Sequence, residues 1–291
     1  MSSLPAEHTT DHSADGNRVP NVIAQREQAQ STPSPQNVAF EEVYDTSNPR
    51  RGTAIILHHE NFKEMQSREG SRRDRQTAIT LLTNMQFDVH VYDDLHYEQL
   101  QQVLEQHATE DHSSSDCLLV MIMTHGDDGV LYAYDRMYKV DTLLEHFMGD
   151  SCPSLLGKPK LFFVQACRGV KYDVGVQLRS IAQDSENIES PKYVIPRTAD
   201  ILVMYSSYDG HLSWRSINDG SWFIQALCAE LEANWQRMEL LQLLTAVSHR
   251  VAYDYHSKVT QDGKMNVMKQ MPTIVSMLTK LVYFPVKSEL Q

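Results

Sequence analysis

The sequence predicts an α/β fold in which a mostly parallel sheet carries helices on both faces. Five short runs are rich in Val, Ile, Leu or Met, which is typical of buried parallel strands. These runs are residues 53–57, 89–92, 117–123, 161–164 and 201–205. Longer segments with helical periodicity alternate with them, and alternation of strands with helices indicates an α/β sheet. The two clearest helical faces carry Ala78, Leu81, Leu82 and Met85, and Leu240, Leu244, Val247 and Val251.

Composition limits the function classes. The 291 residues include 38 acidic and 26 basic side chains, and the net charge of −12 would repel a nucleic-acid backbone. The four cysteines form no CxxC pair, which favours a reducing compartment, and Cys117 and Cys228 are expected to be small core residues. The sequence starts with no signal-peptide pattern, and its longest apolar run, 117–123, is too short to span a bilayer. We therefore expect a soluble, cytoplasmic protein.

Two polar segments stand apart from this α/β pattern. Residues 1–39 contain no Phe, Trp or Tyr and are rich in Ser, Thr, Pro, Gln and Asn, which predicts a flexible leader. Residues 170–199 are polar and aperiodic, and such a long segment inside a compact domain is usually functional or disordered. We expect it to be an exposed connector that splits the core into a larger and a smaller part.

The candidate chemistry lies in two loops that directly follow predicted strands, where open α/β sheets place reactive groups. Thr124-His125-Gly126 follows one strand, and Gln165-Ala166-Cys167-Arg168-Gly169 follows another. If these strands are neighbours, a thiol faces an imidazole that can accept its proton. The backbone N–H groups of Gly126 and Cys167 could then stabilise a tetrahedral oxyanion. This pattern predicts nucleophilic catalysis by Cys167 with His125 as its partner.

The chain resembles the caspase family from about Phe40 to its C-terminus. The Gln165–Gly169 pentapeptide is the known caspase signature. Further blocks occur in caspase order, and they are residues 65–68, 124–126, 157–162, 213–215, 219–225 and 274–278. The resemblance implies a three-layer sandwich with a mostly parallel six-stranded sheet that a dimer extends. It also implies a cysteine endopeptidase that cuts after aspartate, and the short leader resembles that of the executioner group.

The resemblance implies specific site roles. Arg68, Gln165 and Arg215 would line the pocket for the P1 aspartate, and the Gln66 carbonyl would orient His125. The N–H groups of Gly126 and Cys167 would form the oxyanion hole. Two guanidinium groups and an amide suit a small carboxylate on physical grounds, because they offer charged and forked donors.

The outer subsites depart from the family pattern. The resemblance assigns them to Leu212, Ser213, Trp214, Ser216 and Trp222. Leu212 stands where executioner caspases usually carry an aromatic residue, and Ser216 stands where Asn is common. Residues 257–271 lack the aromatic pair that often defines the fourth subsite. Trp222 could instead be a core residue at the start of a helix.

The resemblance also implies a zymogen that is activated by proteolysis and acts in apoptosis. Within the connector, Asp184 followed by Ser185 has the features of a caspase cleavage site, and Asp173 is a lesser candidate. In the leader, Asp15 followed by Gly16 is the first candidate and Asp11 the second. Cleavage after Asp184 would give a large part, residues 40–184, and a small part, residues 185–291.

The expected partners are protein substrates with Asp at P1, an upstream activating caspase, inhibitor-of-apoptosis proteins and a second copy paired through residues 273–278. We expect no cofactor and no metal, because the His and Cys residues do not occur at the spacing that is typical of zinc ligands. Two alternatives stay open. One is a catalytically silent caspase-like scaffold that regulates a sister caspase, and the other is a metacaspase-type or legumain-type protease with basic or amide preference.

Overall fold

The computed structural model describes residues 42–174, 196–261 and 264–287. The chain divides into two units, Met1–Phe40 and Glu41–Gln291, and the described residues all belong to the second, which is compact. The expected leader, residues 1–39, therefore lies outside the described residues. From Glu41 onward, the described residues of the expected large and small parts, 40–184 and 185–291, belong to this one unit. None of the described helices is both long and apolar enough to cross a membrane.

The second unit is built on a six-stranded sheet with the strand order β14-β9-β7-β3-β1-β2. Five strands run parallel and β14 is antiparallel to β9. The strands are β1 (Thr53–His58), β2 (Asp88–Asp93), β3 (Leu118–Met123), β7 (Lys160–Gln165), β9 (Ile201–Tyr205) and β14 (Thr273–Ser276). All five predicted runs are therefore confirmed as neighbouring strands, and the predicted strand at 273–278 is β14, which covers residues 273–276 at one edge of the sheet.

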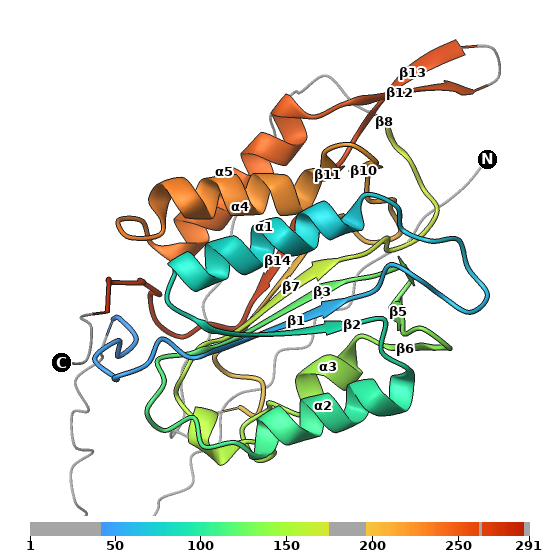
Figure 1. The fold of residues 1–291 in the computed structure, drawn as a ribbon. Helices are drawn as coiled ribbons and strands as arrows, with labels where there is room; N and C mark the ends of the chain where they lie inside the picture. The colour runs from blue at the N-terminus through green and yellow to red at the C-terminus, as the bar shows by residue number, and fades with distance from the viewer. Residues whose placement is uncertain (1–41, 175–195, 262–263, 288–291) are drawn as a thin grey trace, which may run out of the picture. The chain divides into compact units, whose positions relative to one another are not determined.

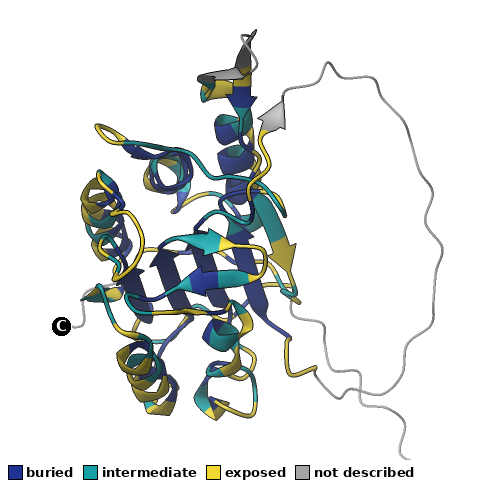
Figure 2. Cartoon of the chain, turned by 90° about the vertical axis from the view of Figure 1, so that its right-hand side faces the viewer, coloured by how far each residue is buried: buried dark blue, intermediate teal, exposed yellow. Residues whose placement is uncertain are grey.

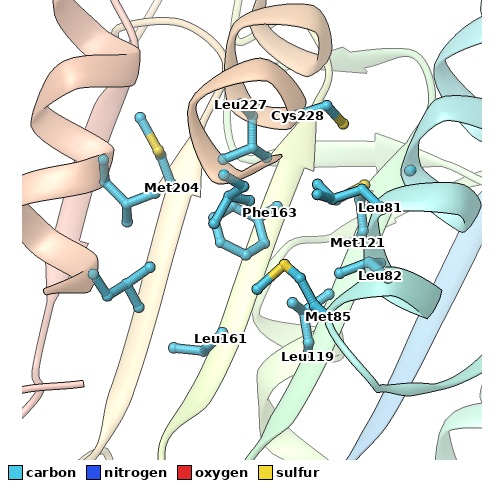
Figure 3. Close-up of a cluster of buried hydrophobic side chains, with 14 of the residues drawn as sticks. Leu81, Leu82, Met85, Leu119, Met121, Leu161, Phe163, Met204, Leu227 and Cys228 are labelled. Carbon is cyan, nitrogen blue, oxygen red and sulfur yellow. The ribbon is translucent and has the colours of Figure 1, made fainter. Parts of the chain in front are cut away.

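Helices cover both faces of this sheet, as predicted (Figure 1). One face carries α1 (Ser71–Asn84), α4 (Trp222–Asn234) and α5 (Leu240–Asp254), and the other carries α2 (Tyr97–Thr109) and α3 (Asp141–Glu145). Side chains of β7 alternate between the two cores, because successive residues of a strand point to opposite faces. Phe163 packs with Leu81 and Leu227 in the first core (Figure 3), whereas Phe162 packs in the second. A sheet buried on both faces holds its strand ends rigidly.

Short strands follow the carboxyl ends of the central strands. They form three small sheets, β4-β5-β6, β10-β11 and β12-β13-β8. Figure 2 looks onto this end of the molecule, where half-buried and exposed loops surround the buried strands. A 3-10 turn, η1 (Pro153–Leu155), precedes β7. The short strands are β4 (Gly126–Asp127), β5 (Val130–Tyr132), β6 (Met137–Lys139), β8 (Asp173–Val174), β10 (Arg215–Ser216), β11 (Gly220–Ser221), β12 (Ser257–Gln261) and β13 (Lys264–Lys269).

The described ends of the predicted connector, residues 170–174 and 196–199, are held by other segments. Its first residues are anchored, because the Lys171 N–H donates to the Gly210 carbonyl at 3.0 Å and β8 pairs with β13. At its other end Ala199 is buried. These anchors are backbone hydrogen bonds to distant segments, which a polar sequence does not reveal. Residues 175–195, and with them Asp184, lie outside the described residues, as do Asp11 and Asp15.

Candidate active site

The sheet brings the two predicted catalytic loops side by side. β3 and β7 are parallel neighbours, with Met123 opposite Gln165, so both loops leave the same edge of the sheet. The Thr124 N–H donates to the Gln165 carbonyl at 3.0 Å. A Cβ atom at position 126 would lie 2.4 Å from the Cys167 carbonyl oxygen. The loops of His125 and Cys167 therefore touch at a point where only glycine fits.

His125 is held from two sides by the loop that follows β1. Its Nε2 lies 2.9 Å from the carbonyl oxygen of Gln66, and its ring packs against Phe62 with 4.6 Å between ring centroids. Burial has the largest effect and lowers the pKa of His125; the hydrogen bond with Gln66 partly offsets it, and the positive charges of Arg68 and Arg215 lower the pKa further. The imidazole is therefore neutral near pH 7. Because a carbonyl can only accept, Nε2 carries the proton and Nδ1 has the free lone pair.

Cys167 differs from the other three cysteines in its exposure. Its side chain is half-buried, while Cys117, Cys152 and Cys228 are buried, and none of the four forms a disulfide. The Ser213 N–H donates to the Cys167 Sγ at 3.4 Å. Burial raises the pKa of Cys117 and of Cys228 to about 12, so these two thiols are inert core residues, as predicted. Cys167 is thus the one accessible thiol of the four.

The three residues predicted to bind aspartate lie near this thiol. Arg68 is only 1% exposed, with its Nη1 donating to the His59 carbonyl at 2.8 Å and its buried Nη2 without a hydrogen-bond partner among the described residues. The Gln165 Nε2 donates to the Ser213 Oγ at 2.8 Å. The Arg215 Nε donates to the Glu69 carbonyl at 3.0 Å. Burial lowers the pKa of both arginines, and the charge of Arg215 adds to this effect on Arg68. Guanidinium groups nevertheless stay protonated.

Asp74 is a site residue that the sequence analysis missed. Its buried carboxylate accepts hydrogen bonds from the Ser221 N–H at 2.8 Å and the Ser221 hydroxyl at 2.5 Å. Burial raises the pKa of Asp74 to about 6, although Ser221, Arg68 and Arg215 act in the opposite direction. Asp74 ties α1 to β11, the strand that pairs with Arg215. An acidic residue in a first helical turn is common, so the sequence alone carries no signal for it.

The predicted outer-subsite residues lie on the segment that runs from β9 to α4. Trp222 is buried between Trp214 and Tyr255, with centroid distances of 5.7 and 5.6 Å. The Leu212 N–H bonds the Lys171 carbonyl at 3.0 Å, and its side chain is half-buried. The Ser216 hydroxyl donates to the Asp219 carboxylate at 3.0 Å and thus closes a turn. Trp222 belongs to an aromatic stack that includes Trp214.

The comparisons with known proteins decide the family. The caspase domain model matches residues 51–283. The chain belongs to the caspase family. It is 42% identical to caspase drICE of Drosophila melanogaster, and the match covers 83% of this chain and 72% of the relative. It is 37% identical to caspase-3 of Bos taurus, and that match covers 85% of this chain and 89% of the relative. The crystal structure of caspase-1 from Spodoptera frugiperda matches with a TM-score of 0.79 at 40% identity, covering 90% of this chain and 99% of that chain.

Family membership confirms the predicted fold, the resemblance to executioner caspases and the class of activity. The caspase is a cysteine endopeptidase that cleaves protein substrates after aspartate and acts in apoptosis. Production as a zymogen and dimerisation are general properties of caspases. Among the described residues, no three His, Cys, Asp or Glu side chains gather in a group that could hold a metal ion.

Proposed function

We propose that Cys167 is the nucleophile and His125 the general base and acid of this caspase. The thiol proton passes to Nδ1 of His125 and the sulfur attacks the carbonyl carbon of the P1 aspartate. The N–H groups of Gly126 and Cys167 stabilise the oxyanion. The C–N bond then breaks, His125 gives its proton to the leaving amine, and water hydrolyses the thioester. The close approach of Gly126 to the Cys167 carbonyl carries this proposal, because it brings the loop of His125 and the loop of Cys167 into contact.

Arg68, Gln165 and Arg215 receive the P1 carboxylate. The buried Nη2 of Arg68, which has no hydrogen-bond partner in the described part of the chain, supports this role, because a buried guanidinium nitrogen without an acceptor is costly until an anion reaches it. The Gln165 amide now donates to the Ser213 hydroxyl. Because a hydroxyl can also donate, the amide can rotate so that its oxygen accepts from Ser213 and its N–H group faces a carboxylate. Leu212, Trp214, Ser216 and Trp222 contribute to the outer subsites. The aliphatic Leu212 admits bulkier residues at P2 than an aromatic residue would.

Covalent labelling of the matured protein tests the nucleophile. A peptide fluoromethyl ketone ending in aspartate loses fluoride as a thiolate forms the C–S bond. We expect one adduct, on Cys167, when the labelled protein is mapped by mass spectrometry, and none in Cys167→Ser. The same reagent ending in asparagine is the matched control. An adduct on Cys152, or a protein that stays unlabelled while folded, would contradict the proposal and favour a silent scaffold.

Activation follows from cleavage after Asp184, with Asp173 a lesser site and Asp15 or Asp11 trimming the leader. The strands on either side of the connector, β7 and β9, are hydrogen-bonded neighbours in the central sheet, which keeps the parts 40–184 and 185–291 associated after the cut. Mass spectrometry of the matured protein should show fragments that end at Asp184. An Asp184→Ala variant that matures and works normally would show that this site is misplaced.

The active form is a homodimer paired through β14, which is the edge of the sheet, with Val275 43% exposed. Unpaired edge strands can join two sheets across a twofold axis. Light scattering should give a dimer, and a fully active monomer at high concentration would contradict this. An upstream activating caspase, inhibitor-of-apoptosis proteins as ligands and a cytoplasmic location remain predictions.

A further inference from the structure

A small pocket lies beside the catalytic histidine, outside the residues assigned above. It has a volume of about 190 Å³, which is less than sites for drug-sized ligands and suits one side chain. Its walls are the loop after β1 and the β5–β6 hairpin. The lining residues are Phe62, Glu64, Met65, Tyr132, Ala133, Tyr134, Asp135, Arg136 and Met137.

The same two walls hold His125 in place. The loop after β1 supplies the Phe62 ring that packs on the imidazole and the Gln66 carbonyl that lies beside Nε2. On the hairpin side, the Tyr132 N–H donates to the His125 carbonyl at 3.1 Å. The walls are joined directly, since the Lys63 N–H donates to the Tyr134 carbonyl at 2.8 Å. The pocket is therefore continuous with the structure that positions the catalytic base.

The direction of the substrate chain follows from the chemistry. The P1 carboxylate enters among Arg68, Gln165 and Arg215, none of which lines the small pocket. The leaving amine must lie against His125, because that imidazole protonates it as the C–N bond breaks. The residues that follow the scissile bond thus pass over His125 towards Phe62. In an extended peptide, side chains alternate between faces, so P2′ points to the same side as P1.

The lining favours an apolar side chain. Two methionines stand at the pocket with exposed fractions of 39% (Met65) and 61% (Met137). Methionine is flexible and adapts to apolar and aromatic partners. The charged groups of the hairpin are already engaged. The Asp135 carboxylate accepts from the Tyr97 N–H at 2.8 Å and from the Arg136 Nε at 3.2 Å, while the Arg136 guanidinium lies 5.6 Å from the Tyr97 ring centroid.

We propose that this pocket binds the P2′ side chain of the substrate and selects large apolar residues, with Met65 and Met137 as the residues that determine the preference. The inference rests on the roles proposed above for His125 and Cys167. Glu64 at the same pocket disfavours an acidic P2′ residue. Because P2′ leaves with the amine, the preference belongs to acylation and appears in kcat/KM, while hydrolysis of the thioester is unaffected.

Internally quenched peptides that differ only at P2′ test the proposal on the matured protein. We expect kcat/KM to be roughly tenfold higher with Leu than with Ser, and lowest with Asp. Met137→Gln should reduce the Leu-to-Ser ratio to below about threefold, because the pocket loses an apolar wall. The matched control is Leu156→Gln, which changes an apolar residue with 57% exposure near the opposite end of β7, and it should keep the wild-type ratio.

A further substrate separates the possible failures. It carries the same residues up to the P1 aspartate, followed by a fluorogenic amine in place of P1′ and P2′. Wild type and Met137→Gln should cut it at equal rates. If neither cuts it, the proposed function fails. If both cut it normally but Leu and Ser at P2′ give equal kcat/KM, or the ratio survives in Met137→Gln, the pocket does not bind P2′.

Discussion

The carbonyl oxygen of Gln66 lies 2.9 Å from Nε2 of His125, and this contact decides which imidazole nitrogen can act as a base. Gln66 belongs to the loop that also carries Arg68 and Phe62, so one segment orients the base, packs its ring and contributes to aspartate recognition. The loop acts through its backbone at Gln66. Substitution of the Gln66 side chain therefore need not disturb the contact.

The pKa of His125 should lie below the ordinary value of about 6.5. Burial is the main cause, and the charges of Arg68 and Arg215 add to it. Arg215→Met should raise this pKa, because removing a nearby positive charge favours the protonated imidazole. NMR titration of the histidine in a Cys167→Ala background measures it, with Arg237→Met as the control. A pKa at or above 6.5 before the Arg215 change would contradict the described environment.

Removing either pocket arginine should weaken catalysis on aspartate peptides. Arg68→Ala and Arg215→Ala should each lower kcat/KM by about 10²-fold, since the P1 carboxylate loses a charged partner in a buried site. Arg237→Ala removes a guanidinium that follows α4 and bonds Asn234, and it should leave kcat/KM unchanged. A loss of less than about fivefold in both pocket variants would place the carboxylate site elsewhere.

Gly126→Ala should impair catalysis through a change of one methyl group. The new Cβ would meet the Cys167 carbonyl oxygen at 2.4 Å and the Ala166 Cβ at 2.9 Å, so the two catalytic loops must separate. We expect kcat/KM to fall by at least about tenfold, because misplacement of catalytic groups by a fraction of an ångström is costly. Gly149→Ala, away from the site, is the control. Wild-type kinetics in Gly126→Ala would mean that the loops do not meet as described.

His59 should make the fold sensitive to acid. Burial lowers the pKa of His59 to about 4, while the unfolded chain has an ordinary value of about 6.5. Between these pH values the unfolded state binds more protons, so the free energy of unfolding falls as the pH falls from about 6.5 towards 4. Asp74 acts in the opposite direction. Its pKa is raised to about 6, so between pH 3.8 and about 6 the folded state binds more protons than the unfolded state, and the contribution of Asp74 to the free energy of unfolding increases as the pH falls.

Chemical denaturation at several pH values checks the His59 prediction. His59→Gln should lose less stability than wild type between pH 6.5 and 4, with a difference on the order of 3 kcal/mol at the acid end. The exposed His249→Gln is the matched control. Parallel pH profiles of wild type and His59→Gln would contradict the role assigned to the buried imidazole.

The sheet and the catalytic loops were predictable because their signals are local. Runs such as 117–123 and 161–164 are apolar throughout, and the loops after them carry Thr124-His125-Gly126 and the Gln165–Gly169 pentapeptide. Asp74 and Phe62 were not predictable, because their significance comes from contacts with Ser221 and His125 that the fold creates. The start of the connector was also missed, since its pairing with β13 depends on backbone hydrogen bonds between distant segments.

The ratio of kcat/KM for two peptides that differ only in aspartate or asparagine at P1 tests the central claim most directly. The two side chains have almost the same shape, so the ratio isolates the charge that Arg68 and Arg215 are proposed to bind. We predict that the matured protein favours aspartate by roughly 10³-fold or more, because asparagine leaves the guanidinium groups of the buried Arg68 and the half-buried Arg215 without an anionic partner. Comparable turnover of the asparagine peptide would contradict the account of Arg68, Gln165 and Arg215 as the P1 site.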